Sequence, residues 1–349
     1  MKVLLAALSV ASCVTTLSLA QDLSPPAELS RFDGTLGNWQ GSGVSRETAD
    51  GAETKWTAVA TVRKILGGHY IQEDMRLDLG EEVPAPLVFR SIYAWDRQTK
   101  RFQYFGMSNM TSPEHGHAFW TADGKMIVSS SRVAQGVVVT DQGVSAYSKD
   151  SYTFRLNRST AGGAFFVHVD GTFQRSDKSF SLPEDSAGPA LAPPPAEMKK
   201  VDYLLGKWTY KGKLRPMAEK PSVAISGREA FRSILGGHVL MARIEDDGVE
   251  GAPRAFRGHG YFAWSTAENC YLQFGLGNYG DFGLQRAYLV GENKIVYTGA
   301  VVMYGTPSAV RTVMERKGKD SLTIVSDRAA GASAPDRSFE GEYKRVRKL

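Results

Sequence analysis

The side chains best suited to acid–base chemistry follow the pair Gly67-Gly68. If residues 69–79 form a strand, alternate side chains point to opposite faces of a sheet. The residues of one face are His69, Ile71, Glu73, Met75 and Leu77, and those of the other are Tyr70, Gln72, Asp74, Arg76 and Asp78. Because the second face is polar, we predict that it is wet and that the face with Glu73 points inward.

The predicted inward position of Glu73 indicates either a partner or a function. Removing a carboxylate from water costs several kcal/mol unless it is paired or protonated. Together with His69 on the same face, Glu73 could act as a general base or hold the polar group of a ligand. The alternative is structural, with His69 and its counterpart His238 at the rim of a barrel, bonding backbone beside the Gly-Gly pairs.

Two other sets of side chains offer weaker chemistry. His115 and His117 share a face if their segment is extended, but Glu114 then points the other way and further metal ligands are missing. Cys270 lies in no nucleophile motif, and the sequence has no phosphate-binding glycine loop. We expect His115 and His117 in a solvated loop and no metal or other cofactor. Whether the protein is an enzyme stays open.

The chain repeats itself at a fixed offset of 169 residues. The sequence LGNW at 36–39 recurs as LGKW at 205–208, and RKILGGH at 63–69 recurs as RSILGGH at 232–238. Such a constant shift indicates a duplication. Features present in both copies are therefore expected to be architecture. Those found once, such as Glu73, are where a specialised function should be sought.

The first twenty residues are typical of an export signal. Lys2 precedes an apolar stretch, and a small-x-small cleavage site ends at Ala20. Residues 10–13 also resemble a bacterial lipobox, in which Cys13 would be lipidated and become the new N-terminus. Of the two, we favour cleavage after Ala20. We therefore expect a periplasmic or secreted protein, attached to a membrane only if Cys13 is lipidated.

Composition and length fit two globular domains. Of 349 residues, 42% are hydrophobic and 23% charged, which excludes a disordered chain. The net charge of +5 is dispersed, so we expect no nucleic-acid partner. We predict a signal peptide at 1–20, one domain at 30–180, a Pro/Ala-rich linker at 181–197 and a second domain at 198–349.

Each copy is predicted to be β-structure. Short runs rich in β-branched and aromatic residues alternate with turn sequences, and the runs of the first copy are 57–63, 69–79, 87–95, 101–108 and 125–131. A short helix of one or two turns is expected at 197–204, and no longer helical periodicity occurs after the signal. This pattern favours a barrel or a sandwich.

These motifs resemble the DUF1579 domain, a member of the lipocalin-like (calycin) group akin to nitrobindin-type barrels. The motifs are Leu-Gly-x-Trp, then Leu-Gly-Gly about 30 residues later, then a strand ending in Trp95 or Trp264. The resemblance implies an all-β fold of two tandem lipocalin-like antiparallel β-barrels, each of eight to ten strands. It also implies an apolar lumen closed at one end by Trp39 or Trp208, and we expect Arg63 and Arg232 to lie across these rings.

A haem ligand is a further implication of the resemblance, because nitrobindin-like relatives carry a haem-ligating histidine on a late strand. His168 is the only residue at a comparable place, and Ser338 stands opposite it in the second copy. We therefore favour a half-exposed strand histidine over a haem site.

The lumen-facing residues define the predicted ligand site. Strand alternation places Phe105, Met107 and Phe274 inside, and the full set of candidate ligand-binding residues is His69, Glu73, Met75, Trp95, Phe105, Met107, His238, Trp264 and Phe274. We predict a binding protein for a small hydrophobic or aromatic molecule. The alternatives are an isomerase or lyase that uses His69 and Glu73, and a structural module of the cell envelope with two filled barrels.

Overall fold

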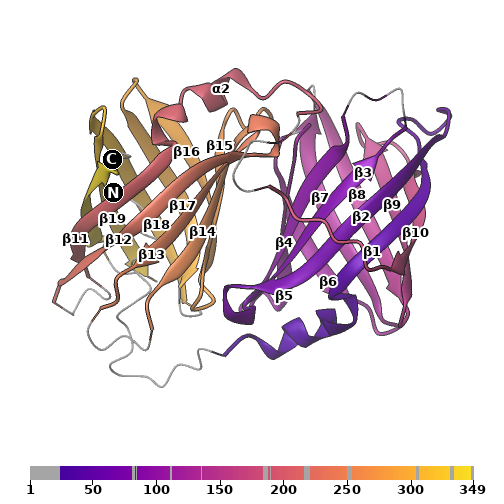
Figure 1. Ribbon diagram of the computed structural model, residues 1–349, viewed down its shortest axis with the longest axis horizontal. Coiled ribbons are helices and arrows are strands. Elements are labelled where there is room, and N and C mark those ends of the chain that lie inside the picture. The colour runs from indigo at the N-terminus through magenta and orange to yellow at the C-terminus, as the bar shows by residue number, and fades with distance from the viewer. Residues whose placement is uncertain are drawn as a thin grey trace.

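The protein folds into two closed antiparallel barrels of ten strands each (Figure 1). The computed structural model describes residues 24–346 except 81–82, 84, 111, 135, 184–187, 189, 216–220, 250–253, 304–305 and 331–333. The predicted signal at 1–20 lies outside these residues. The tandem barrels predicted from the repeat and the family resemblance are confirmed.

Barrel 1 is an up-and-down barrel in which each strand pairs with the next and β10 closes on β1. Its strands are β1 Gly37–Ser45, β2 Thr54–Ile65, β3 Tyr70–Asp78, β4 Leu87–Asp96, β5 Arg101–Ser108, β6 Glu114–Trp120, β7 Lys125–Ala134, β8 Val137–Tyr147, β9 Ser151–Thr160 and β10 Phe166–Arg175. All five runs predicted as strands in the first copy lie within or overlap these elements. The closed order leaves no unpaired sheet edge.

Barrel 2 repeats this order from β11 to β20. Its strands are β11 Gly206–Leu214, β12 Val223–Ile234, β13 Val239–Asp246, β14 Arg257–Ser265, β15 Cys270–Gly277, β16 Phe282–Val290, β17 Lys294–Met303, β18 Thr306–Gly318, β19 Ser321–Ala330 and β20 Asp336–Arg345. The described helices are all short: η3 Ala27–Thr35, η4 Leu66–Gly68, α2 Ala196–Lys199, η5 Asp202–Leu204 and η6 Leu235–Gly237. None of them is long and apolar enough to cross a bilayer.

A short helix closes one end of each barrel. In barrel 1, η3 places Phe32 edge-on against Phe102 and Trp120, with ring centroids 5.1 and 5.5 Å away. The Trp39 indole N–H donates to the Thr35 carbonyl at 2.8 Å, so the helix and the first strand hold each other. The two closed ends lie on opposite sides of the molecule, η3 at the bottom of Figure 1 and α2 at the top.

The arginines that lie over Trp39 and Trp208 are not the ones that we expected. Arg175 lies over the Trp39 ring at 4.2 Å and Arg345 over the Trp208 ring at 4.3 Å, both from the last strand of a barrel. The prediction for Arg63 and its counterpart in the second copy is wrong. Arg63 belongs to the outer face of β2, where it bonds Asp74 instead.

The barrels share a hydrophobic interface built from equivalent strands. Phe105 of β5 stacks on Phe274 of β15 with ring centroids 4.8 Å apart and an interplanar angle of 18°. These residues are equivalent at the 169-residue offset, so the contact is pseudo-twofold, like an interface between identical subunits. Met107 belongs to the same cluster. The prediction that these three residues line a lumen is wrong, because they lie between the barrels.

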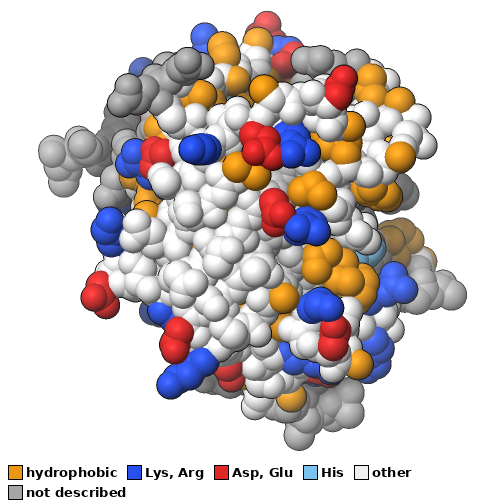
Figure 2. Space-filling view, turned by 90° about the vertical axis from the view of Figure 1, so that its right-hand side faces the viewer, with side chains coloured by type: hydrophobic (Ala, Val, Ile, Leu, Met, Phe, Trp, Pro, Cys, Tyr) orange, Lys and Arg blue, Asp and Glu red, His pale blue; other side chains and the backbone are white. Residues whose placement is uncertain are grey.

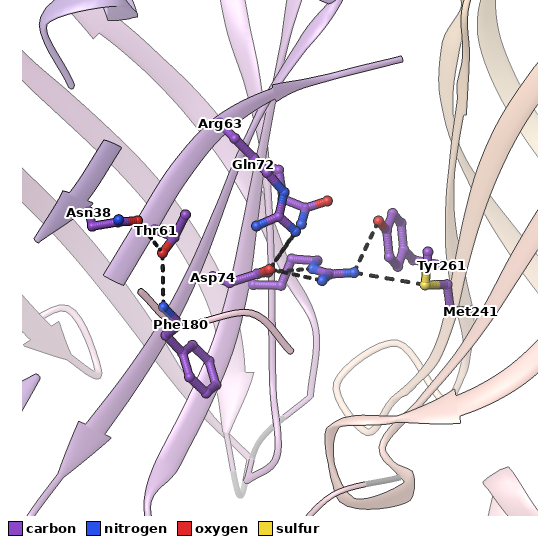
Figure 3. A network of polar contacts seen from close by, with 9 residues as sticks. Asn38, Thr61, Arg63, Gln72, Asp74, Phe180, Met241 and Tyr261 are labelled. Carbon is purple, nitrogen blue, oxygen red and sulfur yellow. Dashed lines mark hydrogen bonds and ion pairs between the residues drawn. The ribbon is translucent and has the colours of Figure 1, made fainter. Parts of the chain in front are cut away.

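A buried ionic network crosses the same interface (Figure 3). Asp74 accepts from Arg90 at 2.6 and 3.0 Å, from Arg63 at 2.7 Å and from Gln72 at 3.1 Å. Arg90 reaches on to the Tyr261 hydroxyl of barrel 2 at 3.4 Å. The predicted wet face of β3 is thus buried at these positions. Its polar groups are tolerated there because they satisfy one another.

The face of barrel 1 that lies away from barrel 2 has mixed character. Figure 2 shows hydrophobic side chains in small groups among scattered charges of both signs and a broad area of uncharged surface. No side chain type dominates this face, so its surface does not single out a partner.

Candidate functional site

The interior of barrel 1 holds a carboxyl group without a partner. Glu73 projects from β3 on the same face as Ile71 and Met75, which belong to the interior cluster. Among the described residues, its carboxylate makes no hydrogen bond or ion pair. Protein surrounds the side chain, yet part of its surface stays accessible, as expected of a group that faces an internal space. The predicted inward orientation of Glu73 is confirmed.

Its surroundings shift the acidity of Glu73. Burial, which disfavours the charged form, raises the pKa of this carboxyl to about 7, and the negative charge of Asp74 on the other face of β3 adds to the rise. A carboxyl of this kind changes its charge near neutral pH. It can therefore donate a hydrogen bond in one state and pair with a cation in the other.

The charge of Glu73 acts on four tyrosine hydroxyls, which come from four different strands. Their hydroxyls sense its charge, which together with burial raises the pKa of each one above the ordinary range, so all four stay neutral. Tyr93 and Tyr104 are neighbours on β4 and β5, with centroids 5.5 Å apart, and Tyr147 and Tyr152 are neighbours on β8 and β9, at 4.9 Å. The wall around the carboxyl is thus largely aromatic.

Several side chains that line the lumen of barrel 1 are partly accessible. Tyr104, Tyr147 and Phe154 pack against the interior cluster but remain only partly buried. The indole N–H groups of Trp56 and Trp120 also face this interior, and they are buried with no acceptor among the described residues. Buried donors normally have partners, so the interior of barrel 1 has unused hydrogen-bonding capacity as well as apolar surface.

Charged side chains gather at the end of barrel 1 opposite η3. Asp141 of β8 accepts from Arg158 at 2.8 Å and also pairs with Arg132. Glu114 accepts from Ser130 at 2.8 Å and lies 3.6 Å from Arg132. Two acids and two arginines thus balance one another, which leaves Glu73 as the interior carboxyl of barrel 1 without a counter-charge.

A cleft of about 210 Å³ between the barrels borders this charged cluster. Its lining residues are Ser112, Pro113, Glu114, His115, Ser131, Arg132, Val138, Ser265, Ala267, Glu268 and Leu272. His115 Nε2 lies 3.7 Å from Glu268 of barrel 2, whereas His117 is exposed. Burial is the largest influence on the pKa of His115, and it lowers this pKa. The two histidines lie on β6, in a strand and not in the solvated loop that we expected.

His69 does not join Glu73. Its ring nitrogen Nε2 lies 3.4 Å from Arg254 of barrel 2, and a Cβ at Gly280 would come within 3.0 Å of the ring. The reason is local: η4 turns the chain at Leu66–Gly68, and His69 follows in a helical conformation and not at the start of β3. The predicted position of His69 in the lumen is wrong, and the structure does not bring a His-Glu pair together.

The other candidate ligand-binding residues are divided between interface and interior. The His238 ring bonds the Ala192 carbonyl at 2.9 Å, in the segment that joins the barrels, which agrees with the structural alternative. Met75 is interior, as predicted. Trp95 packs on Phe102 at 4.8 Å, and Trp264 packs on Tyr271 at 4.9 Å in the second interior cluster.

His168 does not sit in a pocket suited to haem. It occupies an irregularity in the pairing of β10 with β9, and its Nδ1 contacts the Arg46 carbonyl. Burial lowers its pKa, and Arg158, Glu47 and Asp141 act on the ring electrostatically. A porphyrin face needs apolar walls, whereas charged groups border this imidazole.

Barrel 2 has a tighter interior with its own carboxyl, which the sequence reasoning missed. Glu229 of β12 is 2% exposed, and burial raises its pKa to about 8. The adjoining cavity is about 20 Å³, room for about one water molecule. At the 169-residue offset Glu229 matches Ala60, and Glu73 matches Ala242, so the copies exchange Glu and Ala. The alternation of apolar residues around Glu229 was the available signal.

Buried amides accompany Glu229. Gln273 and Gln285, neighbours on β15 and β16, are each 1% exposed, and within the described part of the chain neither amide has a hydrogen-bond partner. Unpaired polar atoms around so small a cavity fit ordered water better than a ligand. Barrel 2 is therefore closely packed around Glu229.

Three solved structures resemble the chain. Rv2717c from M. tuberculosis is 13% identical, covers 44% of this chain with 99% of its own and gives a TM-score of 0.34. A DUF3598 family protein of unknown function from Nostoc punctiforme PCC 73102 is 8% identical, with coverage of 92% and 100% and a TM-score of 0.29. A candidate outer membrane protein from Bacteroides fragilis NCTC 9343 is 10% identical, with coverage of 91% and 99% and a TM-score of 0.20. At these scores the likenesses carry no argument about activity.

Sequence comparison is more informative for barrel 1. No curated protein matches the chain. Residues 24–176, which contain η3 and all ten strands of barrel 1, match the family described as "Protein of unknown function (DUF1579)". This is the family that the Leu-Gly-x-Trp and Leu-Gly-Gly motifs indicated. The first barrel is therefore similar to the DUF1579 family over its whole length.

Proposed function

We propose that this protein binds a small hydrophobic or aromatic molecule in the lumen of barrel 1. One observation carries the proposal: the Glu73 carboxyl faces an enclosed, aromatic-lined interior and has no partner among the described residues. An unpaired buried carboxyl is costly, so it is retained where a ligand completes its interactions. The free indole N–H groups of Trp56 and Trp120 support the same conclusion.

Barrel 2 serves as a support in this proposal. Its interior leaves room for about one water, and it covers the outer face of β3 and β4 through the network around Asp74. Fixing these strands fixes the position of Glu73 on the opposite face. In this proposal barrel 2 has the structural role that we considered as an alternative, and barrel 1 binds the ligand.

Export forms part of the proposal. Its basis is the sequence of residues 1–20, with a basic start, an apolar stretch and a small-x-small site. We place the protein in the periplasm or outside the cell, where a lumen of this kind would capture or carry its ligand. Mass spectrometry of the N-terminus of the protein purified from its host would show whether cleavage occurs after Ala20 or at Cys13.

Filling the lumen should abolish binding. Gly143 faces the interior from β8, and a Cβ there would lie 3.3 Å from the Phe154 ring, a tight contact that requires this ring to shift by a few tenths of an ångström. We expect Gly143→Leu to weaken binding of the neutral aromatic probe N-phenyl-1-naphthylamine at least about tenfold, because the added side chain takes the ligand's space. Probe fluorescence measures the affinity.

The matched control for Gly143→Leu is Thr153→Leu, an exposed position on the outer face of β9. It should bind the probe like the original protein. Equal binding by both variants would contradict a site in the lumen. Absence of any binding by the unaltered protein, across this probe and fatty acids, would contradict the proposed function itself.

A second candidate function is proton transfer by Glu73. The observation that favours it is the pKa of about 7, which suits a general base near neutral pH. His69 is not available as its partner, so Glu73 would act alone or with a tyrosine hydroxyl. Mass spectrometry of small molecules that co-purify with the protein, before and after incubation with it, would show conversion that Glu73→Gln loses while binding persists.

A further inference from the structure

The interior of barrel 1 has an uncompensated negative group in an aromatic surround. Among the residues that the structure describes, the charged side chains that face this interior are Glu73, Glu114, Arg132, Asp141 and Arg158. The last four pair with one another. When Glu73 ionises, the interior therefore carries one net negative charge.

The wall beside Glu73 is suited to positive charge. Tyr93 and Tyr104 lie together on one side of the barrel, and Tyr147 and Tyr152 lie together on another. Trp120 extends the second group, with its ring 5.6 Å from that of Tyr147. Aromatic faces attract cations through their quadrupole, with a contribution that grows once the cation has left water.

We propose that the lumen of barrel 1 selects molecules that carry one alkylammonium group on an apolar or aromatic body, with Glu73 as the counter-ion. The inference rests on the proposed function and names the ligand class of that same site. The ammonium pairs with the carboxylate, and the tyrosine rings solvate its remaining surface. The apolar body replaces water against the partly buried Phe154 and Tyr147.

Barrel 2 provides an internal comparison. Glu229 also lies among aromatic rings, but it is 2% exposed and the adjoining cavity is about 20 Å³. An organic cation cannot reach it without disrupting the core. A carboxyl inside a barrel is therefore not sufficient for binding an organic cation. Barrel 1 differs from barrel 2 in the accessible interior surface around Glu73.

Binding of a cation should be linked to proton release. The groups that face or adjoin Glu73 are the neutral hydroxyls of Tyr93, Tyr104, Tyr147 and Tyr152, the paired Asp74 behind it, and Glu114 and Asp141 next to Tyr104. Burial raises the pKa of Glu73 to about 7. An ammonium ligand must displace its proton at pH 6, so affinity should rise about tenfold from pH 6 to pH 8.

The test compares three ligands of one shape on the full chain by titration calorimetry at pH 8. They are 1-naphthylmethylamine, which is a cation, 1-naphthylmethanol, which is neutral, and 1-naphthoic acid, which is an anion. We expect the amine to bind at least about tenfold more tightly than the alcohol, and the acid to bind least. At pH 6, titrations in buffers of different ionisation enthalpy should show release of nearly one proton per amine bound.

Two variants assign the effect to its residue. Glu73→Gln, which has the same shape, should bind amine and alcohol equally and release no proton. Glu229→Gln, in the filled barrel, should behave like the unaltered protein. A preference for the amine that survives Glu73→Gln would overturn the inference.

The outcomes separate the inference from the proposed function. Equal binding of amine and alcohol by the unaltered protein would overturn the ammonium inference and leave the proposed function standing. Binding of none of the three ligands, nor of N-phenyl-1-naphthylamine, would overturn both.

Discussion

Replacing Glu229 by Gln should stabilise the protein at alkaline pH by as much as about 5 kcal/mol. Burial raises the pKa of this carboxyl from 4.5 to about 8, and the neighbouring Tyr343 hydroxyl offsets only part of that rise. Each unit of pKa difference between folded and unfolded chains corresponds to about 1.4 kcal/mol. Glutamine has nearly the same shape and no charge, so it removes the penalty without opening a cavity.

The pH dependence of this effect has a definite sign. The folded protein keeps the Glu229 proton up to about pH 8, whereas the unfolded chain releases it near pH 4.5. The stability of the unaltered protein should therefore fall as pH rises through this window, and the stability gained by Glu229→Gln should grow over the same range. Below pH 4.5 the two proteins should be equally stable.

Urea unfolding at pH 5, 7 and 9, followed by tryptophan fluorescence, measures both effects. The control is Glu342→Gln, on an exposed position of β20, for which no comparable gain is expected. A Glu229→Gln variant that is less stable at pH 9 would show that the carboxylate has a stabilising partner in the folded protein. That result would contradict the conclusion that burial disfavours the charged form of Glu229.

The second large effect should come from Asp74→Asn, with a loss of roughly 3–5 kcal/mol of stability. Asp74 is fully buried, and it is the acid that accepts from both Arg63 and Arg90. Without the Asp74 charge, the two guanidinium groups would stay close together at the interface with no carboxylate to compensate them. Burial and nearby arginines lower the pKa of His259 to about 3, so that ring is neutral and adds no further positive charge.

Urea unfolding at pH 7 measures this loss, and Asp78→Asn is the matched control. Asp78 lies on the same strand, 45% exposed in its ion pair with Arg76, where a pair contributes under about 1 kcal/mol. The arginines hold the pKa of Asp74 below its usual range against the effect of burial. Its stabilisation is therefore complete above about pH 4 and is lost as pH falls further. Equal losses in both variants would contradict a buried network.

Part of the site followed from the sequence because it depends on strand alternation. The run from His69 to Asp78 alternates with period two, which placed Glu73 and Met75 on one face and predicted correctly that this face is interior. The same rule put His69 on that face and failed. The turn at Leu66–Gly68 continues through His69, so the strand starts one residue later and the histidine faces barrel 2.

The polar face of β3 led to a wrong prediction, because it lies in the interface between the barrels. Tyr70, Gln72 and Asp74 form a polar face, which normally indicates contact with water. Here that face is covered by barrel 2, because Arg63 and Arg90 satisfy Asp74 from neighbouring strands. Such pairing joins residues distant in sequence and cannot be derived from alternation along one strand.

The sequence by itself determined the duplication, the strands and the barrel type, since repeats and period-two patterns are local properties of the chain. Only the tertiary structure decided which barrel is filled and which keeps an accessible interior. Phe105 and Glu73 show the reason. Both lie on strands whose two faces are buried, one against the lumen and one against a second barrel. Whether a strand face is buried against the lumen or against the other barrel depends on how the two barrels pack. That packing is determined by residues spread over both copies.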